Sequence, residues 1–151
     1  MLELARPEER VKVNALAAQV HAMHVSWRPD IYEIADELYT EDRFSGAIRE
    51  RSLYVAKLNG VIIGYAAVKM RNYDWPGVVR RKVMLVDEFC VEESCRGQGL
   101  GHQMMEELRI LARAFGCTDL QLTVDPHNDH AVGFYQKCGY TIKSIGMQRK
   151  V

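Results

Sequence analysis

The sequence has no excess of charge of either sign, since 20 Lys and Arg residues balance 20 Asp and Glu residues over 151 positions. It therefore lacks the basic field that favours nucleic acid, and we expect no nucleic-acid partner. No apolar run approaches the roughly 20 residues of a membrane-spanning helix. The first residues, MLELAR, lack the apolar core of a signal peptide. These absences predict a cytoplasmic protein with no membrane partner.

Paired metal ligands are also missing. The four cysteines lie at positions 90, 95, 117 and 138, without a CxxC pair or a zinc-type His/Cys spacing. Without a secretory signal they are interpreted as reduced thiols. The five histidines show no ligand spacing either and are interpreted mostly as surface residues: His21, His24, His102, His127 and His130. No metal site is expected.

The composition is that of a folded globular protein, with 48% hydrophobic and 26% charged residues. A chain of this length buries about 68–70% of its unfolded surface, enough for one core without staples. We find no repeat, low-complexity segment or linker, so residues 1–151 are predicted to form a single domain.

Hydrophobic periodicity predicts both helices and strands in the first part of the chain. Helices are expected at residues 8–23, 30–39 and 42–50. Strands are expected at residues 2–6, 52–58, 61–70 and 82–91. Asn59-Gly60 joins the second and third of these strands and is the dipeptide preferred in type I′ hairpin turns.

The remaining residues alternate between strands and helices. Helical spacing places one apolar face on Leu100, Met104, Leu108, Leu111 and Phe115, and Gly116 is a suitable residue after the helix end. A strand at 119–125, a helix at 128–137 and one or two closing strands within 140–151 follow. The fold class is therefore α/β (α+β), a mixed sheet with helices on its faces.

A glycine-rich turn follows the strand at 82–91 and opens the next helix: Arg96-Gly97-Gln98-Gly99-Leu100-Gly101. Backbone N–H groups at such a turn lack helical partners, and together with the helix dipole they form an anion site. Arg96 adds a permanent cation. The same glycines could serve helix packing alone, so the turn by itself leaves both readings open. It is neither a P-loop nor a dinucleotide fingerprint.

A second motif lies one helix and one strand downstream, in the segment Asn128-Asp129-His130-Ala131-Val132-Gly133-Phe134-Tyr135-Gln136-Lys137-Cys138-Gly139-Tyr140. Together the two motifs resemble the GNAT superfamily of acyl-CoA N-acyltransferases, and the order of elements fits over essentially the whole chain. The resemblance implies a central, mostly antiparallel sheet of about six or seven strands. It also implies that the sheet splays between its fourth and fifth strands, with about four helices on its faces.

The resemblance further implies acetyl-CoA as co-substrate. Its pantetheine arm would pair with the fourth strand, its pyrophosphate would bind the turn, and Asn128 would assist, although Asn128 also suits a helix N-cap. The residues so implied to bind the cofactor are Phe89, Cys90, Val91, Arg96, Gly97, Gln98, Gly99, Leu100, Gly101, Asn128 and Tyr135. A covalent acyl-cysteine at Cys90 is the less favoured reading, because a small buried residue is expected there.

Tyr135 matches the tyrosine that relatives place near the cofactor sulfur, where a phenol can protonate the leaving thiolate. The alternative is a purely structural aromatic on a short helix. The general base is expected at Asp87 or Glu88. Strand alternation predicts Asp87 on the face of Phe89 and Val91, and resemblance to polyamine acetyltransferases ranks Asp87 first. Thr123 replaces the Glu of some relatives, which argues against acetylation of ribosomal-protein N-termini.

The acceptor is expected to be a primary amine of a small molecule or peptide. Residues 26–45 carry six acidic against two basic side chains, which attracts a cation or forms a solvated helix face. Residues 71–82 are basic and offer Tyr73 and Trp75 as lid aromatics. A non-catalytic acyl-CoA sensor or regulatory module is the alternative function. Dimers are common among relatives, so a homodimer stays open.

Overall fold

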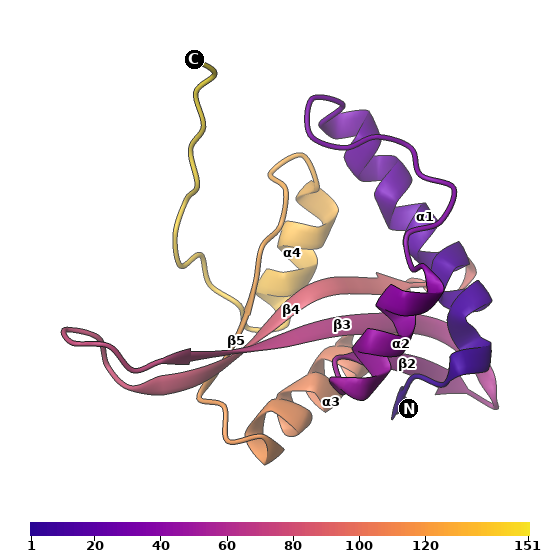
Figure 1. Ribbon diagram of the computed structural model, residues 1–151, viewed down its shortest axis with the longest axis horizontal. Coiled ribbons are helices and arrows are strands. Elements are labelled where there is room, and N and C mark those ends of the chain that lie inside the picture. The colour runs from indigo at the N-terminus through magenta and orange to yellow at the C-terminus, as the bar shows by residue number, and fades with distance from the viewer.

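The computed structural model describes residues 1–151 as one sheet with helices on both faces (Figure 1). The strands are β1 (Leu2–Leu4), β2 (Leu53–Leu58), β3 (Val61–Tyr73), β4 (Arg81–Val91) and β5 (Asp119–Leu122). The helices are α1 (Arg10–Trp27), α2 (Glu41–Arg49), α3 (Leu100–Ala114) and α4 (Asp129–Lys137). The predicted α/β class, the mixed sheet and the number of helices are confirmed.

The strands follow one another in the order β1-β2-β3-β4-β5, so sequence neighbours are also sheet neighbours. The first four are antiparallel, and β5 alone runs parallel to its neighbour β4. A parallel pair needs a long crossover, and α3 supplies it. This crossover brings the glycine-rich turn, at the start of α3, to the carboxyl end of β4.

Two apolar layers hold the helices on the sheet. On one face, α1 and α2 bury residues such as Leu16 and Phe44 against Tyr65 and Cys90. On the other face, α3 buries Leu108 and its neighbours against β3 and β4, and the aromatic side chains of α4 pack at the edge of this layer. Each sheet face thus carries its own helices, and the middle parts of β2, β3 and β4 are buried between them.

Local signals are confirmed at the turns and helix ends. Asn59 and Gly60 have φ values of 51° and 79°, as a type I′ turn requires. The Thr40 hydroxyl accepts a hydrogen bond from the Arg43 N–H and caps α2. The Asn128 side chain accepts one from the Ala131 N–H and caps α4.

The helix predicted at residues 30–39 is wrong, because this segment forms turns and irregular loop. Ile31, Ile34 and Tyr32 are exposed, and only Leu38 and Tyr39 at the end of the segment pack on the core, so the apolar residues form no continuous helical face. Asp30 was expected to cap the helix. It is instead engaged by the Arg28 guanidinium at 2.8 and 2.9 Å, which closes a local turn.

The sheet is smaller than predicted, with five strands instead of six or seven. The strand expected at residues 119–125 ends at Leu122, and the closing strands expected within 140–151 are absent. Residues 141–151 are extended and exposed and have no strand beside them. No helix of the chain is both long enough and apolar enough to cross a membrane.

Candidate active site

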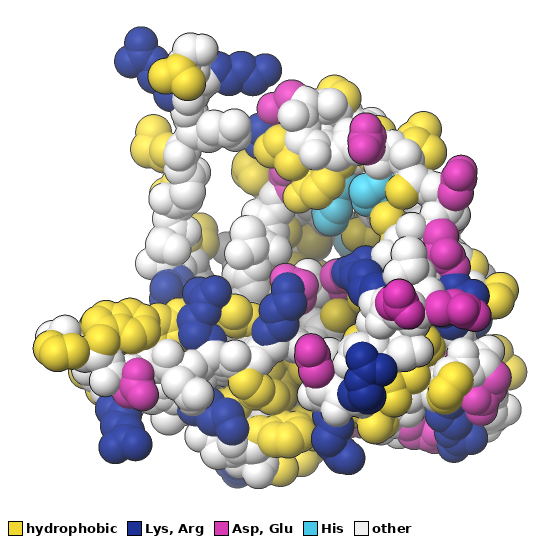
Figure 2. All heavy atoms as spheres, viewed as in Figure 1, with side chains coloured by type: hydrophobic (Ala, Val, Ile, Leu, Met, Phe, Trp, Pro, Cys, Tyr) yellow, Lys and Arg dark blue, Asp and Glu magenta, His cyan; other side chains and the backbone are white.

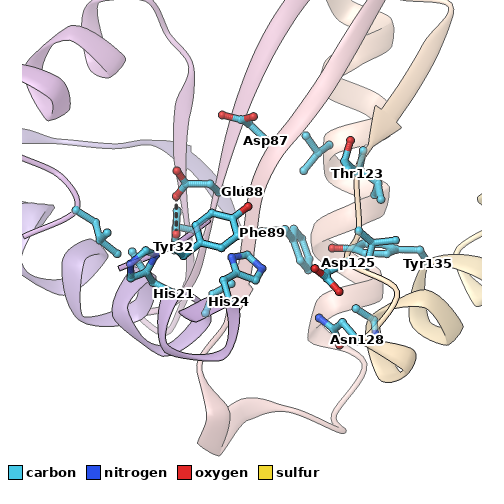
Figure 3. A pocket seen from close by; sticks show the side chains of 18 of the residues that line it. His21, His24, Tyr32, Asp87, Glu88, Phe89, Thr123, Asp125, Asn128 and Tyr135 are labelled. Carbon is cyan, nitrogen blue, oxygen red and sulfur yellow. Dashed lines mark hydrogen bonds between the residues drawn. The ribbon is translucent and has the colours of Figure 1, made fainter. Parts of the chain in front are cut away.

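The two parallel strands separate within the sheet. β4 and β5 are paired from Val83 with Asp119 to Val86 with Leu122, and beyond these residues no pairing joins them. A cavity of about 410 Å³ occupies the space between the diverging segments. Helix α1 and the loop after it form one wall, and the segment from Leu122 into α4 forms the other (Figure 3). The predicted splay between the fourth and fifth strands is confirmed.

A β-bulge lies where the strands part. Ala67 pairs with Glu88 and Val68 with Val86, which leaves Asp87 as the extra residue of β4. The prediction that Asp87 shares the face of Phe89 is therefore wrong, because it assumed regular alternation through this point. Asp87 bonds Lys69 on β3 at 2.7 Å, while Phe89 packs on α4.

Glu88 is the centre of a hydrogen-bond network at the floor of the cavity. Its carboxylate accepts hydrogen bonds from the Tyr39 hydroxyl at 3.0 Å, the Tyr65 hydroxyl at 2.7 Å and the Arg43 guanidinium at 2.8 Å. Burial, followed by the charge of Glu88, raises the pKa of both Tyr39 and Tyr65 well above the ordinary value. Both phenols therefore remain donors, and Glu88 is held as an oriented carboxylate.

Tyr135 faces this carboxylate region from the opposite wall (Figure 3). Its ring packs edge-on against Phe89 and Tyr140, at centroid distances of 6.5 and 5.8 Å. Burial raises the pKa of Tyr135 to about 12. The phenol thus keeps its proton at neutral pH. Tyr135 and Asn128 line the same cavity.

The glycine-rich turn lies at the end of the same cleft. The N–H groups of residues 97–102 donate to no acceptor of the chain, and the first helical bond is from the Gln103 N–H to the Gly99 carbonyl at 3.1 Å. Gly99 caps α3 with a φ of 78°. A Cβ at Gly101 would lie 3.1 Å from the Phe134 ring. This close approach joins the start of α3 to α4.

Arg96 connects the glycine-rich turn to the end of β4, because its Nε–H donates a hydrogen bond to the Val91 carbonyl at 3.0 Å. Phe89 lines the cavity, whereas the Cys90 side chain points away from it, into the layer under α1. Burial raises the pKa of the Cys90 thiol to about 11. A thiol held neutral in this way is a poor nucleophile, which supports the structural reading of Cys90.

Two histidines line the cavity, although both were expected at the surface. His21 and His24 project from α1 into the hollow seen in Figures 2 and 3. His24 stacks on Tyr32 at 5.3 Å, and burial lowers the pKa of its imidazole. Their spacing of three residues, which places both on one helix face, was the available signal.

The cavity is acidic, but not through the residues expected. Asp87, Glu88 and Asp125 line it against Arg43, while the acidic side chains of residues 30–42 do not. The basic segment 71–82 lies outside as well, so Tyr73 and Trp75 form no lid. Tyr73 instead stacks under the Arg81 guanidinium at 4.7 Å.

Comparison with known proteins identifies the family of this chain. The model of the acetyltransferase (GNAT) family matches residues 18–140. The chain therefore belongs to the GNAT acetyltransferase family. The resemblance inferred from the two motifs is confirmed.

Individual relatives agree with this assignment. The uncharacterized N-acetyltransferase YdgE of Bacillus subtilis is 35% identical over 71 residues, which are 47% of this chain and 45% of that protein. The match thus spans less than half of the curated relative. The BH1408 protein of Bacillus halodurans, in a crystal structure of its F44R mutant, has the same fold with a TM-score of 0.93. It is 24% identical, and the alignment covers 100% of this chain and 99% of that one.

A further solved structure is that of the aminoglycoside N-acetyltransferase AAC(6')-Iy in complex with CoA. It has a TM-score of 0.72 and 16% identity, over 99% of this chain and 93% of that one.

The raised pKa of Tyr135 predicts that the free energy of unfolding falls at alkaline pH. The unfolded phenol ionises near pH 10 and the folded one near 12, so the associated stability is present below pH 10 and lost as pH rises to 12. We expect the free energy of unfolding of wild type to fall faster than that of Tyr135→Phe, by about 1 kcal/mol per pH unit in this range. Urea unfolding at pH 9, 10 and 11 measures it, and parallel curves would contradict the assignment.

Proposed function

We propose that this protein is an acetyl-CoA-dependent N-acetyltransferase that moves an acetyl group directly to a primary amine of a small molecule or peptide. The observation that carries the proposal is the cleft between β4 and β5, which opens at one end onto six unbonded backbone N–H groups and contains a neutral phenol and a carboxylate. The family membership and the CoA complex of AAC(6')-Iy support the choice of cofactor.

The cofactor would lie along β4. Its pyrophosphate suits the N–H groups of residues 97–102 at the start of α3, and Arg96 adds a charged donor. Its pantetheine amides suit the backbone of Phe89 to Val91, whose only strand partner is β3 on the far side. The Asn128 amide N–H₂ is available beside the cleft, because the cap of α4 uses only its oxygen.

The acceptor would enter from the side of α1. Asp87, Glu88 and Asp125 make the lining acidic and attract the ammonium form of an amine. Glu88 already accepts three hydrogen bonds, so its role in this scheme is to bind and orient the charge. Asp87, held by Lys69, is the second member of this acidic pair.

The transfer itself is a direct displacement through a tetrahedral intermediate. The amine nitrogen attacks the thioester carbonyl carbon, and the C–S bond breaks as the intermediate collapses. Tyr135 gives its proton to the thiolate that leaves, which yields free CoA. The amine must first lose a proton, because an alkylamine is mostly protonated at neutral pH.

For the general base, the cleft geometry favours a residue other than Asp87 or Glu88. Asp87 is already ion-paired with Lys69 and Glu88 with Arg43, so neither carboxylate is free to meet the amine alone. His24 lies on the acceptor wall, and no hydrogen bond of the chain uses its imidazole. We therefore assign the proton from the amine to His24, directly or through water, with Asp87 as the alternative.

Binding of acetyl-CoA tests the proposal first. We expect calorimetry to show one site per chain, and Arg96→Glu to weaken binding about tenfold or more, since a charged hydrogen bond contributes roughly 1.5–3 kcal/mol. Arg113→Glu, an equal charge change at the far end of α3, is the matched control and should bind like wild type. Absence of binding by the folded wild type would refute the function.

Tyr135→Phe tests the acid. The variant keeps the ring packing and removes only the hydroxyl, so acetyl-CoA affinity should stay within about twofold while turnover falls by about 100-fold or more. Thiol release with a panel of amines measures turnover. Unchanged turnover would remove Tyr135 from the chemistry, and tight binding with no release for any amine would favour the sensor alternative.

The pH profile tests the base. Burial lowers the pKa of His24, so the imidazole is neutral and able to accept a proton above pH 6.5. Asp125, His21 and Glu88 are the titratable groups that act on it. In wild type we expect kcat/KM to decline below pH 6.5, and His24→Gln to be slower and to lose this decline. His21→Gln, on the same helix face, should retain it. An unchanged acid limb in His24→Gln would return the role to Asp87.

A further inference from the structure

A second cavity, which we call the α3 groove, lies between helix α3 and the β1–β2 edge of the sheet. It has a volume of about 250 Å³ and is lined by Leu2, Tyr54, Glu107, Ile110, Leu111 and Ala114. None of these residues lines the cleft between β4 and β5. Figure 1 shows α3 on the side of the sheet away from α1, which forms one wall of that cleft. The two cavities are therefore separate sites.

The lining of the α3 groove is mostly apolar. Five of its six residues are hydrophobic. Ile110 is 57% exposed, and Ala114, one turn further along the same helix face, is exposed as well. Apolar surface that is left in contact with water becomes favourable when a ligand covers it. The groove thus favours a ligand with an apolar body.

The hydroxyl of Tyr54 is the polar group of this groove that has no partner. Tyr54 is 5% exposed, and its hydroxyl oxygen is buried and forms no hydrogen bond. Buried polar groups are almost always hydrogen-bonded, and one that stays unpaired destabilises the folded chain. Burial raises the pKa of the Tyr54 phenol, so the hydroxyl keeps its proton and is a hydrogen-bond donor. A ligand that satisfies it must therefore present an acceptor.

Glu107, the charged residue of the lining, is already satisfied within the chain. Its Oε2 accepts a hydrogen bond from the Leu2 N–H at 2.7 Å and lies 3.5 Å from the ammonium group of Met1. Its Oε1 accepts a hydrogen bond from the Gln103 side-chain amide at 3.5 Å. A cationic ligand would have to compete with the Met1 ammonium, and an anionic one would meet the carboxylate. Both effects favour a neutral ligand.

The size of the α3 groove favours a small molecule over a protein. An apolar cavity of about 150 Å³ is large enough to bind benzene, so the α3 groove has room for a ring with a short substituent. A specific protein interface instead uses about 20–30 residues on each side. The six lining residues of the groove fall far short of that number.

We propose that the α3 groove binds a neutral small molecule, similar in size to a substituted benzene ring, whose hydrogen-bond acceptor pairs with the Tyr54 hydroxyl. The apolar body of the ligand would cover Ile110, Leu111 and Ala114. Its acceptor would pair the one donor that the chain leaves without a partner in this groove. The proposal does not depend on the acetyltransferase function, because the groove shares no residue with the cleft between β4 and β5.

A titration followed by residue-resolved NMR tests the proposal with two probes. Acetophenone is a neutral aryl ketone with an acceptor oxygen, and ethylbenzene has the same size and shape without one. We expect acetophenone to cause saturable shifts at the six lining residues of the wild-type chain. Tyr54→Phe keeps the ring and removes the donor, so it should weaken acetophenone about three- to tenfold while ethylbenzene affinity stays within about twofold.

A second pair of variants tests the location. Ala114→Phe places a large ring in the α3 groove and should abolish binding of both probes, whereas Ala15→Phe makes the same change at an exposed position of α1 and should bind like wild type. The NMR spectrum of each variant shows that it is folded. The proposal is overturned if wild type shows no saturable shift, if Tyr54→Phe binds acetophenone as tightly as wild type, or if Ala114→Phe still binds. Shifts at the lining residues that follow protein concentration without a probe would assign the groove to a second copy and would also overturn it.

Discussion

The parting of β4 from β5 after Val86 and Leu122 is the constraint on which the site depends. Four residue pairs hold the parallel strands together, and the bulge at Asp87 then turns β4 away from regular pairing. Because α3 and α4 continue from these strands, the separation leaves a cavity with a helix start at one end and a helix face on the side. A closed sheet would bring the same residues together as core.

The two walls of the cleft carry different ionisable side chains. Burial keeps the phenol of Tyr135 protonated on one wall, while three donors fix the orientation of the Glu88 side chain on the other. The Glu88 network further ties the loop before α2 to β3 and β4 through Tyr39, Tyr65 and Arg43. One partly buried carboxylate therefore connects the α1 side of the cleft to the sheet, and its removal would leave the buried Tyr39 and Tyr65 hydroxyls without an acceptor, at a cost in stability.

What could be predicted from the sequence was encoded locally. The Asn59-Gly60 turn, the Asn128 cap and the glycine-rich start of α3 each depend on a few adjacent residues, and all three are confirmed. The bulge at Asp87, the loop at 30–39 and the extended residues 141–151 depend on distant partners, or on their absence, which periodicity cannot report. His24 was missed because its spacing from His21 shows only that both lie on one helix face, and not that β4, β5 and α4 build a cavity opposite that face.

Amide hydrogen exchange on addition of acetyl-CoA tests most directly the claim that the cofactor occupies the separation of β4 and β5. The account predicts slower exchange at the N–H groups of residues 97–102, which have no acceptor in the chain, together with the cleft-facing groups of Phe89 to Val91. Amides of the β2–β3 turn, at residues 58–61, should exchange unchanged. Acetyl-CoA binding that leaves residues 89–102 unprotected would contradict the account.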